Sequence, residues 1–417
     1  MRNILLTSIA VLALGNIATP AFAEDSKTSE ATTLAEAITK GKAKLTFRYR
    51  AEAVEQDGFA NDAFASTLRT RLKYTTAPLN GFFGVLEFDN VANIGGGNFN
   101  STVNGNTAYP VVADPQITEV NQAYLAYTGI EKTTLLAGRV AHNIGNQRFV
   151  GTVGWRQNDQ TWDMAAMINS SIPDLTLTGA YVWNVNRIFG NDHPFGDLDT
   201  NSFIFDARYS GLPFGNLAAY ALVIDLNDPA VYGLSSKTYG VRFDGKHKVG
   251  AGDASFIYEA EYAIQSDNAD NPTSFSADYL HLSAGFVVGG LTAKVGFEQL
   301  GSDNGIASFQ TPLATLHKFN GWADKFLGTP ANGLEDLYFS VSYKVQGDGA
   351  MKGLKFDAIY HDFSADFGGG SYGTELDLQI SKKFMKHYSF GLKYANYQAD
   401  GFGSDTQKYW FSLGAAF

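Results

Sequence analysis

From position 43 onward, apolar and polar residues alternate with a period of two in one segment after another. In the first segment, Phe47 and Tyr49 alternate with Arg48 and Arg50. Successive side chains of an extended strand point to opposite faces, so this pattern places apolar side chains on one face and charged side chains on the other. Helical periodicity is nearly absent from the same part of the chain. The sequence therefore predicts an all-β protein.

The charged face separates a membrane barrel from a soluble β-sandwich, which would show the same alternation. Leu376 and Leu378 alternate with Glu375 and Asp377, so one face of this segment carries full charges. A dry core accepts charges only when they are paired, whereas the lumen of an outer-membrane barrel is wet. The segments are also about ten residues long, as a tilted strand that crosses a bilayer requires. These features predict a closed transmembrane antiparallel β-barrel.

The pattern predicts about eighteen strands, with sixteen as the alternative, from one near 43–53 to one near 407–417. Connectors after even-numbered strands are short, as at 128–131, 170–174 and 289–290. Most connectors after odd-numbered strands are long and polar, as at 94–116, 141–159 and 301–334. Outer-membrane barrels have short periplasmic turns and long extracellular loops. We therefore expect the first strand to begin in the periplasm and every long connector to lie outside the cell.

The N-terminal segment predicts export. Arg2 precedes an apolar stretch at 4–17, and Ala21-Phe22-Ala23 forms a small-x-small cleavage site. We predict a signal peptide at 1–23, a polar periplasmic leader with one weak helix at 24–42, and the barrel at 43–417. A retained N-terminal anchor is the alternative, but the apolar stretch is short for a membrane-spanning helix. Together with the barrel, export predicts the outer membrane of a Gram-negative bacterium, with its lipid as a partner.

The last ten residues predict how the barrel closes. One face carries five apolar side chains, namely Tyr409, Phe411, Leu413, Ala415 and Phe417. A terminal aromatic residue on an alternating strand resembles the signal that the outer-membrane barrel assembly machinery reads, which makes that machinery a second expected partner. Because a closed barrel has no edge, we expect this strand to pair with the first one.

Composition and motifs argue against several other classes of function. The net charge of −11 disfavours nucleic acid as a partner. The match to G-x-S-x-G at 369–373 lies in a glycine-rich connector that leads into a strand, not in the strand–turn–helix setting of a nucleophile. The seven histidines show no metal-ligand spacing. Acidic and amide residues near 192–199 and 267–271 can bind Ca²⁺, but a solvated loop explains them better because no EF-hand spacing is present. We therefore expect no enzyme activity, no cofactor and no metal.

Charged residues on the inward face are the candidate pore lining. The basic set comprises Arg48, Arg50, Arg69, Arg71, Arg139, Arg148, Arg156, Arg208 and Arg242. The acidic set comprises Glu87, Asp89, Glu259 and Glu261. A turn near 57–60 predicts that Arg48 lies close to Arg69, and the next hairpin predicts that Arg69 lies close to Glu87. Such residues either handle anions specifically or only keep the wall of the lumen wet, and the strands leave both readings open.

Five motifs resemble those of the alginate export family of outer-membrane channels. They are TEVNQAYL at 118–125, NQRFVG at 146–151, GWRQN at 154–158, NVNRIFG at 184–190 and TPLATLH at 311–317. The resemblance spans nearly the whole mature chain and implies an eighteen-stranded barrel with an arginine-rich conduit for a polyanionic uronate chain. Arg148 and Arg156 lie in the connector 141–159, which we expect to fold inward and narrow the pore. The resemblance fixes the fold and the class of protein, rather than the solute or the direction of transport.

The leading functional hypothesis is a passive channel for hydrophilic anionic solutes such as alginate or uronate oligosaccharides. A general porin without preference beyond size is the alternative, and a barrel enzyme or a loop-based receptor or adhesin are weaker ones. We expect a monomer, although the sequence leaves a trimer, the gate and the direction of transport open.

Overall fold

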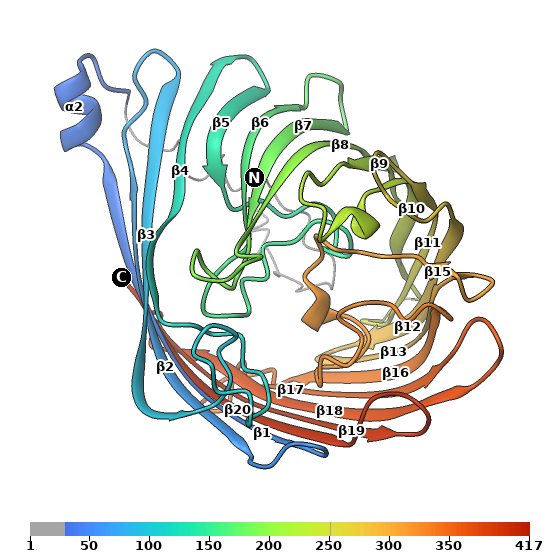
Figure 1. The fold of residues 1–417 in the computed structure, drawn as a ribbon. Coiled ribbons are helices and arrows are strands. Elements are labelled where there is room, and N and C mark those ends of the chain that lie inside the picture. The colour runs from blue at the N-terminus through green and yellow to red at the C-terminus, as the bar shows by residue number, and fades with distance from the viewer. Residues whose placement is uncertain (1–29, 251) are drawn as a thin grey trace.

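The computed structural model describes residues 30–250 and 252–417, and it places their strands in one closed barrel (Figure 1). The predicted signal peptide lies outside these residues. The barrel strands are β1 Lys42–Gln56, β2 Ala63–Thr75, β3 Phe82–Asn98, β4 Ile117–Ile130, β5 Thr133–Val140, β6 Thr161–Asn169, β7 Leu175–Asn186, β8 Asp197–Leu212, β9 Gly215–Ile224, β10 Ser236–Lys248, β11 Ser255–Asp267, β12 Ser276–Val288, β13 Leu291–Leu300, β16 Leu334–Lys344, β17 Lys355–Ser364, β18 Ser371–Phe384, β19 Tyr388–Ala399 and β20 Thr406–Ala416. This eighteen-stranded sheet confirms the prediction.

Every strand pairs antiparallel with its neighbours in the sequence, and β1 also pairs with β20. Closure satisfies the backbone groups that an edge strand would leave unpaired, which is a requirement inside a bilayer. The remaining described elements are small. They are helix α2 at Leu34–Thr39, the two-residue strands β14 Ser302–Asp303 and β15 Ala307–Ser308, and the 3₁₀ turns η1 Tyr232–Leu234 and η2 Leu316–Lys318. No helix among the described residues is both long and apolar enough to cross a membrane.

The two faces of the strands differ as the alternation predicts. On β11, Tyr262 and Ile264 are 46% and 47% exposed, whereas Glu261 and Ala263, which alternate with them, are buried. The outward face of the other strands carries the same kind of side chain, including Leu125, Phe205, Val295, Leu337 and Phe339. A continuous apolar outer surface around a polar interior is what a bilayer-spanning barrel needs.

The connectors differ in length at the two ends of the barrel. At one end most of them are short, such as the two residues between β4 and β5 and between β12 and β13. We call this the short-turn end. At the other end three connectors are long, at 99–116, 141–160 and 301–333. The predicted alternation is confirmed, except that the connector at 345–354 is longer than the other turns at its end.

The C-terminal residue closes the barrel on its outer face. The amide of Phe417 donates to the carbonyl of Leu45, and the amide of Leu45 donates to the carbonyl of Phe417. The Phe417 ring is 57% exposed and stacks on His387 at 5.4 Å between ring centroids. The predicted place of this residue, on the apolar face beside the first strand, is therefore confirmed.

Changing Phe417 to aspartate, or deleting it, should lower the yield of heat-modifiable barrel in outer membranes, because a charge replaces an apolar ring on the lipid-facing surface. Electrophoresis of unheated and heated membranes measures that yield. Phe417→Tyr keeps the ring and should assemble like the unmodified protein. An equal yield from the aspartate variant would show that the terminal ring has no part in assembly.

Candidate functional site

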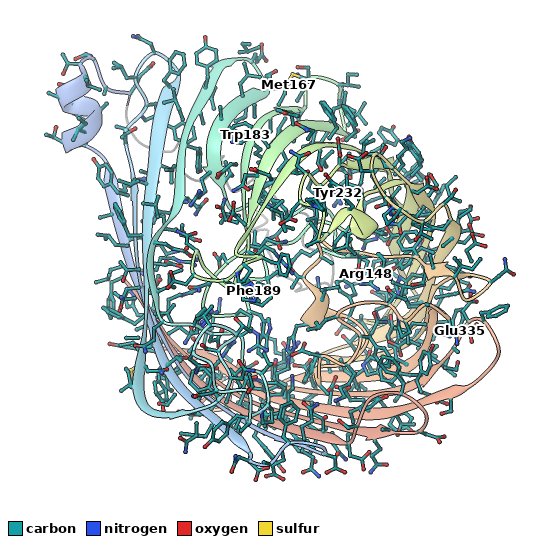
Figure 2. All side chains as sticks on the ribbon, viewed as in Figure 1. Arg148, Met167, Trp183, Phe189, Tyr232 and Glu335 are labelled. Carbon is teal, nitrogen blue, oxygen red and sulfur yellow. The ribbon has the colours of Figure 1, made fainter. Side chains whose placement is uncertain are left out.

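Three long connectors fold into the barrel and form its inner loops, 99–116, 141–160 and 301–333. In Figure 1 they lie within the ring of strands, and Figure 2 shows Arg148 well inside the wall. The predicted inward fold of the second connector is confirmed by contacts of Arg148 and Arg156 with distant strands. The inward fold of 301–333 was not predicted from the sequence.

Apolar contacts hold the inner loops to the wall. Phe326 packs against Phe363 at 4.6 Å and against Phe402 at 5.3 Å between ring centroids. Phe149 lies 5.0 Å from Tyr220 and 5.9 Å from Phe309, so it joins two inner loops to β9. Rings buried in this way fix a loop in one position, as in a protein core. The inner loops are therefore part of the packed structure.

Arg148 fastens one inner loop to another and to the wall. Its Nε donates to Glu298 Oε1 on β13 at 2.7 Å, and its Nη2 donates to Asn320 Oδ1 at 3.0 Å. The side chain is only 1% exposed. Its partners lie on β13 and in the loop 301–333. With its charge neutralised and its donors occupied, Arg148 has a structural role.

Arg156 makes a second junction, between the inner loops and β1. Its Nη1 donates to Glu52 Oε2 on β1 at 2.9 Å, and its Nη2 donates to Asp324 Oδ2 at 3.3 Å. Burial lowers the pKa of the Arg156 guanidinium, but the charges of Glu52, Asp114 and Asp324 outweigh burial and raise it above the ordinary value. Arg156 is thus a fixed cation that joins all three inner loops to the wall.

The arginines of β1 and β2 face the inner loops and differ in their partners. Arg50 lies 3.2 Å from Asp114 Oδ2, and Arg71 lies 2.8 Å from Asp159 Oδ2 and also binds Asp89. Within the described part of the chain, Arg48 hydrogen-bonds only to neutral oxygens, including Gln157 Oε1 at 3.0 Å. It is therefore the arginine of this wall whose charge is least compensated.

The register of the first two hairpins tests two predicted neighbours. Arg48 stands directly opposite Arg69, as predicted. Glu87, however, stands opposite Lys73, whereas Arg69 stands opposite Val91. The predicted contact between Arg69 and Glu87 is wrong because the hairpin turns at Asn80 and Gly81, which both have positive φ, and this shifts the register by four residues.

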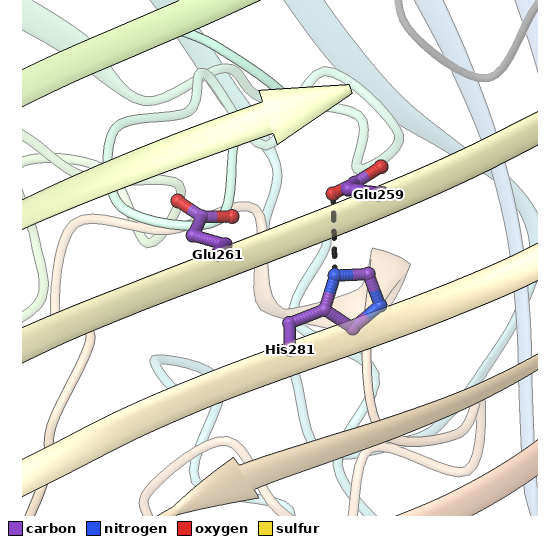
Figure 3. Close-up of side chains that lie close together, drawn as sticks. All are labelled: Glu259, Glu261 and His281. Atoms are coloured by element: carbon purple, nitrogen blue, oxygen red, sulfur yellow. Dashed lines mark ion pairs between the residues drawn. The ribbon is translucent and has the colours of Figure 1, made fainter. Parts of the chain in front are cut away.

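The remaining candidates lie farther round the wall, on β5, β10 and β11. Arg139 pairs with Asp163 at 2.8 Å. Arg242 lies 3.1 Å from Glu259, and Glu261 accepts a hydrogen bond from Tyr220 at 2.8 Å. Figure 3 shows Glu259 and Glu261 beside His281, whose Nδ1 is 3.2 Å from Glu259 Oε1. The ligand atoms of these three residues lie within 4.8 Å of one another, but the guanidinium of Arg242 already supplies a cation beside them.

A basic cluster surrounds the tip of the loop 141–160. We define it as Arg208, Arg242, Lys294 and Lys318. The two guanidinium groups approach Gly145 closely, because a Cβ atom added there would lie 3.7 Å from Arg208 Nη2 and 4.0 Å from Arg242 Nη1. Lys318 Nζ donates to the carbonyl of Asn146 at 2.7 Å. Arg208 has no ion pair or hydrogen bond to any residue in 30–250 or 252–417. Burial and the charge of Arg242 lower the pKa of Lys318 to about 8, which Glu259 partly opposes and Lys294 reinforces.

Aromatic rings and cations meet where two inner loops reach β19. Trp155 stacks on His317 at 3.5 Å between ring centroids and lies 4.1 Å from the guanidinium carbon of Arg50. Lys393 Nζ lies 3.6 Å from the ring centroid of Trp322 and 2.5 Å from His317 Nε2. Sequence reasoning missed this junction because its members come from four separate segments, β1, β19 and two inner loops. The sequence drew attention to Trp155 and His317 only because they lie in the motifs at 154–158 and 311–317.

His317 should make this junction sensitive to acid. Burial lowers the pKa of His317 well below its ordinary value, Asp324 partly opposes this effect, and Lys393 and Arg156 add to it. The neutral ring then donates from Nδ1 to Asp324, 2.6 Å away, and accepts from Lys393 at Nε2. Because the unfolded chain binds this proton more readily, the neutral ring's contribution to stability is present above the ordinary histidine pKa and falls as the pH drops below it.

We therefore expect faster amide hydrogen exchange at 315–326 at about pH 5 than at neutral pH, after correction for the intrinsic rate. His317→Gln cannot titrate, so it should lose much of this difference. A pH-independent exchange pattern in the unmodified protein would contradict the assignment of His317.

Comparison with known proteins gives a fold. No protein-family model and no curated protein matches the sequence. Among solved structures, the outer membrane protein OpdK of Pseudomonas aeruginosa is 15% identical with a TM-score of 0.69, and the match covers 90% of this chain and 98% of OpdK. OccAB3 of Acinetobacter baumannii is also 15% identical with a TM-score of 0.71, over 91% of this chain and all of OccAB3. The chain has the fold of an outer-membrane porin. These neighbours do not single out the alginate export family.

Proposed function

We propose that this protein is an outer-membrane channel through which small hydrophilic solutes pass, with a preference for solutes that carry a carboxylate. The short-turn end then faces the periplasm and the inner loops enter from the outside. The apolar outer surface and the polar, loop-narrowed interior support the channel. The observation that carries the anion preference is a group of lumenal cations, each at least partly exposed, that have no carboxylate of residues 30–250 and 252–417 within ion-pair distance. They are Arg48, Arg208, Lys294 and Lys318.

Uncompensated cations between low-dielectric walls attract an anion more strongly than cations on an open surface do. Guanidinium groups also bind a carboxylate through two parallel hydrogen bonds. Trp155 lies against Arg50 and Trp322 lies against Lys393, so partly exposed aromatic rings alternate with cations on this side of the lumen. This combination suits a small carboxylate that has an apolar or cyclic body. A structure of OpdK with vanillate, an aromatic carboxylate, has a TM-score of 0.68 to this chain.

Uronates form a narrower candidate group of the same kind, because each sugar ring carries one carboxylate. Most of the other arginines predicted to line the pore are held by carboxylates of the chain, as at Arg71, Arg139 and Arg156. A continuous ladder for a long polyanion would need those guanidinium groups to be available. This pairing favours short solutes, monomeric or oligomeric, over an alginate chain.

Uptake into liposomes that contain the purified protein tests the proposal. We expect vanillate and galacturonate to enter several-fold faster than neutral analogues of the same size. Arg208→Gln and Lys318→Gln should reduce this ratio, whereas Lys352→Gln removes the same charge from an exposed turn and should leave it unchanged. Equal rates for charged and neutral solutes would leave only a general porin. Transport of oligouronates but not of small carboxylates would favour an alginate-type channel.

A further inference from the structure

Helix α2 carries an apolar stripe that no part of the described chain covers. Leu34 is 69% exposed and Ile38 is 53% exposed. Residues four apart lie on the same side of a helix, so the two side chains are adjacent. Glu36 and Lys40, which form an ion pair of 3.2 Å, lie on the other side. The short helix is therefore amphipathic, with its larger apolar side chains directed away from the protein.

The barrel holds this helix in one orientation. The amide of Ala77, in the turn between β2 and β3, donates to the carbonyl of Ala37 at 2.9 Å, and the Tyr74 hydroxyl donates to the carbonyl of Ile38. Ala31, Ala37 and Ala77 are buried together. Figure 1 shows α2 outside the ring of strands, beside β3. The exposed stripe is thus fixed relative to the barrel wall.

The stripe continues the apolar outer surface of the barrel. Leu79 packs against the buried alanines that join α2 to the barrel. Its backbone hydrogen-bonds to that of Phe82, which is 46% exposed at the start of β3.

We propose that α2 is an interfacial helix, which lies in the leaflet at the short-turn end with Leu34 and Ile38 at the boundary between headgroups and acyl chains. Its occupant is the phospholipid itself, because the stripe is continuous with the lipid-facing surface. This inference rests on the proposed membrane location of the barrel. It assigns part of the predicted periplasmic leader to the membrane surface and fixes the depth of the barrel at that end.

The chain has no cysteine, so single-cysteine variants can be labelled at one position each. We choose Leu34→Cys and Ile38→Cys on the stripe, and Thr39→Cys on the opposite side of the same helix as the matched control. Leu125→Cys, at an outward position of β4 that is 54% exposed, reports on insertion of the barrel. Each variant carries an environment-sensitive fluorophore and is reconstituted in phosphatidylethanolamine–phosphatidylglycerol vesicles.

Nitroxide lipids labelled near the headgroup should quench the fluorophores at positions 34 and 38 several-fold more than the one at 39, which iodide in the water should quench instead. If position 125 is quenched by lipid while 34 and 38 respond like 39, the interfacial placement of α2 is wrong but the membrane location of the barrel stands. If position 125 also escapes the lipid quencher, the proposed function itself fails. Shielding of 34 and 38 from both quenchers would identify a protein contact and overturn the lipid assignment.

Discussion

Replacing residues 144–158 with a short glycine–serine linker should raise the single-channel conductance several-fold. An eighteen-stranded barrel is wide enough to leave an aqueous passage, so the inner loops set its narrowest part. The segment carries Arg148 and Arg156, which tie it to the loop 301–333 and to β1. Its removal deletes part of the constriction and releases the neighbouring loop.

The control for this variant is an equally drastic shortening of a connector at the rim, 268–275, whose removal should change the conductance little. Both variants need to remain heat-modifiable, because the comparison requires folded barrels. A conductance that stays the same after loss of 144–158 would show that the narrowest part of the passage lies elsewhere.

Arg148→Ala should lower the free energy of unfolding by about 3–5 kcal/mol, because it leaves the carboxylate of Glu298 buried without its counter-ion. Glu298 is 4% exposed, and Asn320 and Thr311 lose a donor at the same time. Urea titration of the protein in lipid vesicles, followed by tryptophan fluorescence, measures the loss. Arg148→Met combined with Glu298→Gln removes both charges and should recover much of the stability. A single variant as stable as the unmodified protein would contradict the fastening role of Arg148.

Local sequence pattern determines the barrel, which is why it was predictable. The alternation at Leu376 and Leu378 against Glu375 and Asp377 indicates directly which face points outward, and the structure exposes the first pair and buries the second. The C-terminal alternation likewise predicted the place of Phe417. Each of these patterns needs only residues that are near one another in the sequence.

The interior was less predictable because its contacts join distant segments. The ion pair of Arg148 and Glu298 spans 150 positions, and no period or motif connects them. The error at Glu87 came from the turn at Asn80, because one hairpin's register depends on where its turn closes. Charge alone also could not tell Arg48, with neutral partners, from Arg71, with carboxylate partners.

The most direct test of the channel and of its anion preference is the reversal potential of the unmodified protein in a planar bilayer with a gradient of dilute KCl. We expect stepwise ion currents and a reversal potential of the sign for chloride preference. This preference should weaken as the salt concentration rises and screens the lumenal cations. Stepwise currents with a reversal potential on the potassium side would contradict the anion preference, and the absence of currents from correctly folded protein would contradict the channel.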